Sequence, residues 1–278
     1  MDGENSIQDA ALINYLRGIS LFFFELTQTE FTLVTIQAGS VCFEQIHAII
    51  FDKDGTLADS QEFLRNLGRR RARLLDARIP GVQEPLLLAF GLEGDRLNPA
   101  GLLAVGTRIE NEIAAATYVT ETGRDWIESL KIARLAFTEA DHVFKRKADH
   151  TPLFKDALEL LQLLAKKDVK VAIASSDSSD HVQDFIECYQ LNSLIPFALG
   201  SELGFSKPDP RLVFKLCEDM NVSPTKTLVV GDSIADIEMA QGANTAGCLG
   251  VTWGWNSSVY LKNADTVVQS FAEIKVLD

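Results

Sequence analysis

The chain lacks a long apolar run, has few cysteines, and carries more acidic than basic residues. No apolar run approaches the ~18 residues that a membrane-spanning helix needs, so we expect no membrane contact. Its four cysteines show no C-x-x-C spacing and no pairing with histidine, which favours reduced thiols over disulfides or a zinc site. A net charge of −13 argues against binding to nucleic acid, because that requires clustered cations.

The N-terminal segment shows no feature of a secretory signal. It starts with Asp2 and Glu4, and its apolar run from Ile19 to Phe24 is short and ends at Glu25. We therefore expect a soluble cytoplasmic protein. Residues 1–45 are expected to form an extension, either a poorly ordered tail or a helix followed by a hairpin between Phe31 and Ile46.

Most of the remaining chain alternates between short apolar runs and helical stretches. The apolar runs are typical of strands buried on both faces of a parallel sheet: Ile46 to Phe51, Val169 to Ala174, Thr227 to Val230, and Cys248 to Val251. The alternation predicts an α/β fold with a doubly wound, Rossmann-like parallel sheet. Functional sites in such sheets gather at the carboxyl ends of the strands.

Residues 62–150 interrupt this alternation. No strand-like run stands out there, and apolar residues from Trp126 to Phe144 recur at intervals of four and three, which is typical of a helix. We therefore predict a helical domain over residues 62–150, inserted into a core domain made of residues 46–61 and 151–278.

Two aspartates follow the first buried strand. Asp52 and Asp54 can face the same side because alternate residues of an extended chain share a face. One carboxylate could attack phosphorus, and its neighbour could transfer a proton. Lys53, between them, is expected to point away from Asp52. An acidic turn with glycine also occurs on ordinary surfaces, but its place after a buried strand favours catalysis.

Three later strings supply the other groups that phosphoryl transfer needs. Ser175 and Ser176 follow a strand, and either could offer a hydroxyl or simply cap a helix. Lys207 precedes Pro208, which restricts its backbone, and Pro210 suits the first turn of the next helix; this favours a directed cation over a solvated one. Asp232 follows another strand, where it could bind a hard cation such as Mg²⁺, cap a helix, or do both.

Together these strings resemble motifs I to IV of the haloacid dehalogenase (HAD) superfamily, most closely its phosphoglycolate phosphatase-like branch. The motifs are Asp52-Lys53-Asp54-Gly55-Thr56, Ser175, Lys207-Pro208-Asp209-Pro210, and Gly231-Asp232 with Asp236. The resemblance implies a phosphatase that hydrolyses a small organic phosphomonoester through a phosphorylated Asp52, with Asp54 as acid and base.

The same resemblance implies a Mg²⁺ cofactor and the positions of its ligands. Asp52, the backbone carbonyl of Asp54, and Asp232 would bind the metal, with Asp236 in support near Lys207. Ser175, or Ser176 if the register differs by one, would bind phosphate together with Lys207.

Residues 62–150 match the position and helical character of a C1 cap, which covers the site and recognises the leaving group. Arg65 and Arg69 lie four residues apart on one helical face and are the better candidates for an anionic substrate.

Two alternatives to a phosphatase remain open. A phosphomutase of the β-phosphoglucomutase type shares all four motifs, and a non-catalytic subunit with this fold is the other alternative. The sequence leaves the substrate unnamed and allows a monomer or a homodimer.

Overall fold

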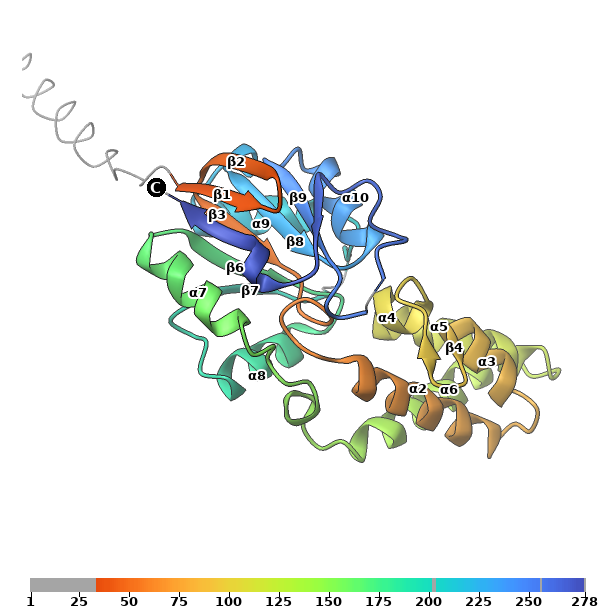
Figure 1. The fold of residues 1–278 in the computed structure, drawn as a ribbon. Helices are drawn as coiled ribbons and strands as arrows, with labels where there is room; N and C mark the ends of the chain where they lie inside the picture. Colours follow the sequence, from red (N-terminus) through yellow and green to blue (C-terminus); the bar gives the residue numbers. More distant parts are fainter. Residues whose placement is uncertain (1–33, 202–203, 256, 278) are drawn as a thin grey trace, which may run out of the picture. The chain divides into compact units, whose positions relative to one another are not determined.

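The structure is a computed structural model that describes residues 34–201, 204–255 and 257–277. Its main element is a six-stranded sheet in the order β10-β9-β8-β3-β6-β7, in which every neighbouring pair is parallel (Figure 1). The strands are β3 (Ala48–Phe51), β6 (Lys170–Ala174), β7 (Phe197–Leu199), β8 (Thr227–Gly231), β9 (Gly247–Val251) and β10 (Thr266–Val268). The chain leaves β3 first to one side and then to the other, which confirms the predicted doubly wound α/β fold.

Helices cover both faces of this sheet. They are α7 (Ala157–Lys166), α8 (Ser179–Cys188), α9 (Arg211–Met220) and α10 (Ile234–Gly242). The side chains of β3 alternate between the two faces: Ile49 and Phe51 pack with residues of α7 and α8, whereas Ala48 and Ile50 pack with residues of α9 and α10. This two-sided burial explains why the strand is apolar at every position.

A second sheet covers part of one face. It is antiparallel in the order β11-β1-β2 and consists of β1 (Val34–Ala38), β2 (Val41–Ile46) and β11 (Ile274–Leu277). β1 and β2 form a hairpin that turns at Gly39, where φ is +57°. Residues of β1 and β2 belong to the same core cluster as Phe51, so this hairpin packs as part of the core. The helix expected between residues 10 and 26 lies outside the described residues.

Ile36→Ala is expected to lower the free energy of unfolding by about 2–5 kcal/mol, the usual cost of truncating a large core side chain. The Ile36 side chain is fully buried between the hairpin and the larger sheet. Urea denaturation would measure the change. The control is Leu277→Ala on β11, where the side chain is 39% exposed and a smaller loss is expected. Equal, small losses in both variants would show that the hairpin contributes little to the core.

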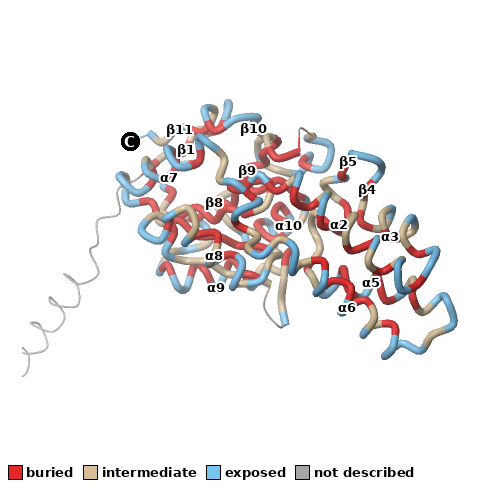
Figure 2. The backbone as a smooth tube through the Cα atoms, turned by 90° about the horizontal axis from the view of Figure 1, so that it is seen from below, coloured by how far each residue is buried: buried red, intermediate tan, exposed pale blue. Residues whose placement is uncertain are grey.

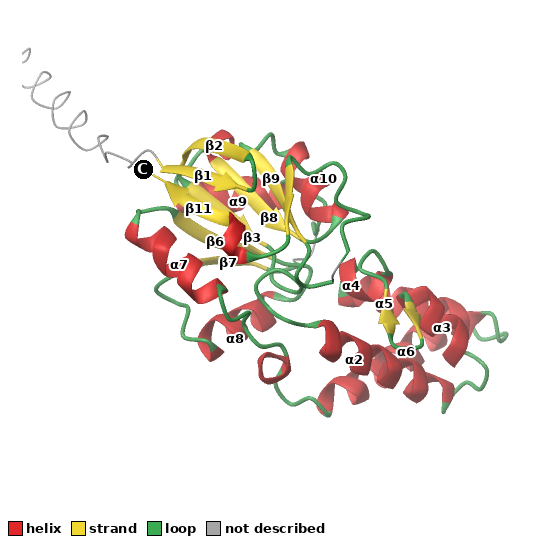
Figure 3. Ribbon diagram, in the orientation of Figure 1, coloured by secondary structure: helices red, strands yellow, loops and turns green. Residues whose placement is uncertain are grey.

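The residues between β3 and β6 form a helical insertion, as predicted. Its helices gather apart from the large sheet (Figure 3) and are α2 (Gln61–Asp76), α3 (Gln83–Phe90), α4 (Leu102–Val105), α5 (Arg108–Thr120) and α6 (Trp126–His142). They enclose an apolar cluster that includes Leu67, Phe90 and Phe137 and that Trp255 of the core also joins. Figure 2 colours the buried residues along α2, α5 and α6 red. The 3₁₀ helix η1 (Lys147–His150) leads back toward the core.

One detail of the insertion differs from the expectation that it holds no strands. A short hairpin of β4 (Leu92–Glu93) and β5 (Arg96–Leu97) turns at Gly94, where φ is +55°. Strands of two residues are too short to produce a period of alternating burial, so the sequence gives no sign of them. No helix in the described part of the chain has the length and apolar character needed to cross a membrane.

Candidate active site

The carboxylate of Asp52 lies at the carboxyl end of the central strand of the large sheet. Its backbone N–H donates to the carbonyl of Val230 on β8 at 2.8 Å, which fixes where β3 ends. The ammonium group of Lys207 donates to Asp52 Oδ1 and, at 2.6 Å, to Asp236 Oδ1. Burial raises the pKa of Asp52 to about 6, assisted by Asp236 and opposed by Lys207. One buried cation therefore joins two buried carboxylates.

Asp236 is held in place by the start of α10. Ser233 is the N-cap residue, and its backbone N–H and hydroxyl donate to Asp236 Oδ2 at 3.1 and 2.6 Å. This is a capping box, which fixes the orientation of a side chain in the first helical turn. Because its other oxygen accepts from Lys207, Asp236 sets the direction of that lysine toward Asp52.

Asp232 follows β8 and is held by two donors from distant parts of the chain. The hydroxyl of Thr56 donates to Asp232 Oδ1 at 3.0 Å, and the indole N–H of Trp255 donates to Oδ2. Gly55 lies beside this pair with φ of +90°, and a Cβ there would collide with both Asp232 and Trp255. Burial, together with the charges of Asp52 and Asp236, raises the pKa of Asp232 well above its usual value.

Asp54 belongs to a balanced group of two lysines and two aspartates. Lys147 Nζ lies 2.8 Å from Asp54 Oδ2 and 2.5 Å from Asp177 Oδ2, and Lys53 Nζ lies 2.7 Å from Asp54 Oδ1 and 3.1 Å from Asp177 Oδ2. Burial alone would raise the pKa of Asp54, but Lys147 and Lys53 outweigh it and hold that pKa below its usual value. Asp54 is therefore ionised at neutral pH.

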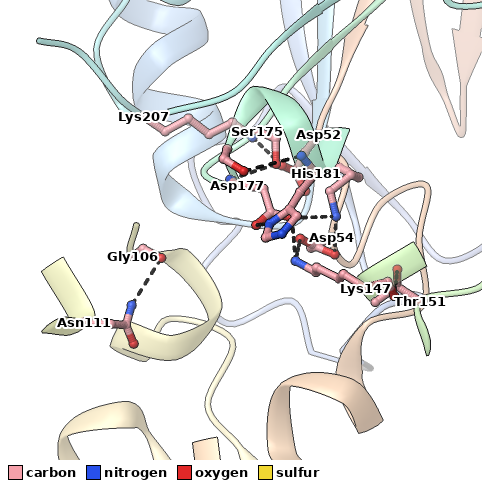
Figure 4. Close-up of polar contacts among 12 residues, drawn as sticks. Asp52, Asp54, Gly106, Asn111, Lys147, Thr151, Ser175, Asp177, His181 and Lys207 are labelled. Carbon is pink, nitrogen blue, oxygen red and sulfur yellow. Dashed lines mark hydrogen bonds and ion pairs between the residues drawn. The ribbon is translucent and has the colours of Figure 1, made fainter. Parts of the chain in front are cut away.

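Asp177 connects this group to the loop after β6. Its backbone N–H donates to Ser175 Oγ at 3.1 Å, and its other carboxylate oxygen lies 3.3 Å from His181 Nδ1 (Figure 4). Ser178, not Ser175, caps α8, since its side chain accepts from the backbone N–H of His181. Helix α8 is thus capped without Ser175. The buried hydroxyl of Ser175 instead accepts from the backbone N–H of Asp177 in the loop after β6.

A cavity of about 80 Å³ opens beside these groups. This is well below the ~300–1,000 Å³ typical of sites for drug-sized ligands, so it suits a small molecule. It is lined by Asp52, Asp54, Leu64, Leu67, Arg71, Leu103, Ala104, Val105, Gly106, Arg108, Asn111, Lys147, Ser175, Ser176, Asp177, Lys207, Asp232 and Ser233. The core supplies the acidic groups and the hydroxyls, and the helical insertion supplies the opposite wall.

Comparison with known protein families identifies the fold and the chemistry class. Residues 46–244 match the family model described as haloacid dehalogenase-like hydrolase. That match spans more than half of the chain and includes every group described above except Trp255.

The chain belongs to the HAD-like hydrolase family.

Curated relatives of this HAD hydrolase include bacterial phosphoglycolate phosphatases. The protein of Haemophilus influenzae is 27% identical over 242 residues, which cover 83% of this chain and 97% of that protein. The protein of Escherichia coli K12 is 26% identical over 238 residues, which cover 84% and 92%.

Solved structures share the fold of this HAD hydrolase. A predicted phosphoglycolate phosphatase from Haemophilus somnus has a TM-score of 0.63 and 22% identity, covering 82% of this chain and 96% of its own. A β-phosphoglucomutase from Clostridium difficile has a TM-score of 0.58 and 16% identity, covering 83% and 93%. At these identities the likeness extends to the fold alone.

The structure brings most of the predicted site residues of the HAD motifs together. Asp52, Asp54, Ser175, Ser176, Lys207 and Asp232 all line the cavity, and Asp236 lies behind Lys207. Their individual roles remain predictions. Arg65 and Arg69 do not line this cavity; Arg65 contacts Gln61 and the carbonyl of Asp95, and Arg69 binds Gly94 and Asp95 at the surface.

Sequence reasoning missed several groups at the site. The side chain of Lys53 points away from Asp52, as expected, but its fully buried ammonium group contacts Asp54 and Asp177. Nothing in the sequence joins Lys147 to Asp177, which lie 30 positions apart. Arg71 gave a usable signal: it lies four residues from both Leu67 and Leu75, on the apolar stripe of α2. A charged residue in the middle of a buried stripe favours a functional contact.

Proposed function

We propose that this HAD hydrolase is a Mg²⁺-dependent phosphatase that hydrolyses a small, phosphoglycolate-like organic phosphomonoester through a phosphorylated Asp52. The observation that carries the proposal is the placement of Asp52 and Asp54 at the end of one strand, facing one small cavity with Lys207. The curated phosphoglycolate phosphatases among its relatives support the choice of substrate class.

Asp52 is the proposed nucleophile. Its carboxylate oxygen attacks phosphorus while the bond from phosphorus to the leaving oxygen breaks. Lys207 stabilises the charge that develops on the transferred group, because it is buried, fixed by Asp236, and already in place before the reaction. Ser175 or Ser176 and Lys207 are the proposed phosphate-binding side chains.

Asp54 is the proposed acid and base. A bound phosphate dianion raises the pKa of this carboxyl, which allows it to carry the proton that the leaving oxygen receives. The resulting carboxylate is then stabilised by Lys147 and Lys53 and accepts a proton from the water that attacks phosphorylated Asp52. The bond between phosphorus and Asp52 breaks in this second step and releases inorganic phosphate.

The donor set fits Mg²⁺, although no group of three or more acidic, histidine or cysteine side chains suited to a metal occurs among the described residues. Mg²⁺ usually takes only one or two carboxylates, with water and phosphate oxygens completing its shell. Asp52 and Asp232 line the cavity and have raised pKa values, so a divalent cation would relieve their repulsion. They and the backbone carbonyl of Asp54 would hold the ion, which supplies positive charge to the phosphate.

We also propose residues 62–150 as the cap and residues 46–61 with 151–278 as the core. The separate apolar clusters of the two parts support this division. Within the proposed extension, residues 1–45, the β1–β2 hairpin packs on the core.

Phosphate release is the direct test. With Mg²⁺, the purified chain is expected to release phosphate from p-nitrophenyl phosphate and, faster, from a small metabolite such as 2-phosphoglycolate. EDTA should abolish the release and added Mg²⁺ should restore it. No release from a broad panel of phosphate esters would refute the proposal. Conversion of a sugar phosphate into its isomer without phosphate release would indicate a phosphomutase instead.

A further inference from the structure

Two arginines of the cap share one carboxylate beside the cavity. Arg71 on α2 donates from Nη2 to Asp141 Oδ1 at 3.1 Å, and Arg108 at the start of α5 pairs through Nη1 with Asp141 Oδ2. Both arginines line the same cavity as Asp52. They therefore form a cationic pair on the wall that faces the proposed nucleophile.

The charge of this pair is not fully balanced. Arg108 also binds Glu112 at 2.8 Å, but Glu112 is shared with Arg134 at 3.3 Å. Three guanidinium groups thus meet only two carboxylates. Arg134 is 57% exposed and Arg108 38% exposed, so water solvates part of this charge. Arg71 is buried, and a buried charge is costly unless it is fully paired and hydrogen-bonded, so the need for a further anion is greatest there.

The guanidinium group of Arg71 itself lacks a full set of hydrogen-bond acceptors. It is only 7% exposed, and its buried Nε finds no acceptor among the described residues. Its guanidinium lies over the ring of Phe137 at 4.6 Å, which offers a weak contact in place of a second carboxylate. Burial and the nearby charge of Arg108 lower the pKa of Arg71 to about 9, and the charges of Asp177 and Glu112 oppose this only in part.

Apart from these arginines, the cap side of the cavity is mostly apolar, with Leu64, Leu67 and Leu103 among its lining side chains. Lys147 also lines it, but its charge is paired with Asp54 and Asp177. A neutral hydroxyl would form weaker hydrogen bonds with the guanidinium groups than an anionic group would. A planar carboxylate or a phosphate, in contrast, matches the paired N–H donors of arginine.

We propose that Arg71 and Arg108 form a second anion-binding subsite, which recognises a carboxylate or phosphate on the alcohol part of a short substrate. This inference rests on the proposed phosphatase function and adds the substrate class: a small phosphate ester with a second anionic group. The small cavity favours a substrate with a short carbon skeleton, such as the two carbons of 2-phosphoglycolate.

The test compares substrates that share a two-carbon skeleton and differ in the distal group. They are 2-phosphoglycolate with a carboxylate, the bisphosphate of ethylene glycol, and 2-hydroxyethyl phosphate with a neutral hydroxyl. Wild type is expected to prefer at least one anionic substrate over the neutral one by about 10- to 100-fold in kcat/KM, the usual worth of a charge-assisted hydrogen bond. The anionic substrate with the higher kcat/KM shows whether the subsite binds a carboxylate or a phosphate.

Arg108→Met and Arg71→Met should each remove most of that preference: kcat/KM for the anionic substrate should fall, mainly through KM, by a much larger factor than kcat/KM for 2-hydroxyethyl phosphate. The matched control is Arg78→Met, since Arg78 follows α2 and pairs with Glu139 of α6 at 2.6 Å but does not line the cavity. This control should keep the preference. Arg108, 38% exposed, carries the test if the Arg71 variant does not fold.

Equal losses on the charged and neutral substrates, or no preference in wild type, would overturn the subsite. Failure of the phosphatase proposal gives a different result, namely no turnover of p-nitrophenyl phosphate by wild type. In that case calorimetry on the Asp52→Asn chain still decides the subsite. Binding of 2-phosphoglycolate should weaken with Arg108→Met and not with Arg78→Met, and equal binding in both would refute it.

Discussion

Asp52→Asn is expected to reduce phosphate release by at least ~10⁴-fold, the scale on which covalent nucleophiles contribute. An amide cannot attack phosphorus, and the neighbouring carboxylates have other partners. Asp54 pairs with Lys147 and Lys53, and Asp232 accepts from Thr56 and Trp255. Steady-state rates on p-nitrophenyl phosphate and intact-mass detection of a phosphorylated chain would measure the loss.

The Asp52→Asn chain should still fold. Burial and the charge of Asp236 disfavour an ionised Asp52, and Lys207 keeps Asp236 as its partner after the change. The control is Asp59→Asn in the same loop, where the residue is exposed, and activity there should remain near wild type. A phosphorylated chain that persists in the Asp52→Asn variant would assign the nucleophile to another residue.

The proposed catalytic motifs could be predicted because each depends on local chain geometry. A run buried on both faces predicts a parallel strand, and parallel strands end at one edge of their sheet. Asp52 and Asp232 follow such strands directly, so their meeting at one cavity needs no knowledge of the loops between them. Lys207 could be predicted for a different reason, since Pro208 directly after it restricts its backbone.

The two edge strands of the large sheet, β7 and β10, could not be predicted because their local sequence carries no such signal. β7 lies at the edge of the large sheet, and its three residues are all only partly buried. β10 is equally short and occupies the other edge. Edge strands lack the two-sided burial that produces an unbroken apolar run, and three residues are too few to show alternation.

The side of the cavity formed by the helical insertion could not be predicted. Helical periodicity shows which residues share a face of a helix, but it does not show which part of the protein that face contacts. Arg65 and Arg69 do share a face, but that face meets the β4–β5 hairpin through Asp95. Arg71 lies two positions beyond Arg69 and so points to nearly the opposite side of α2. Which side faces the cavity depends on how the insertion packs against the core, and the sequence of one helix does not contain that information.

Asp54→Asn is expected to slow hydrolysis of an alkyl phosphate by at least ~10²-fold, while metal binding changes little. The backbone carbonyl proposed as a metal ligand survives this change, and the side chain contacts Lys147 and Lys53 instead of Asp232. The loss should be smaller in the first step for an aryl phosphate, whose leaving group needs little protonation. Rates on both substrates and calorimetric Mg²⁺ titration would measure these effects.

The two steps respond differently to this substitution, which makes the assignment testable. With an aryl phosphate the first step proceeds but the second lacks its base, so phosphorylated Asp52 should accumulate and be visible by intact mass. Lys147 and Lys53 keep Asp177 as a partner, so the chain should fold, and Asp59→Asn again serves as the control. Near-normal turnover of an alkyl phosphate by Asp54→Asn would contradict its role as acid and base. The buried lysine pair around Asp54 would then serve only to hold the loop after β3 in place.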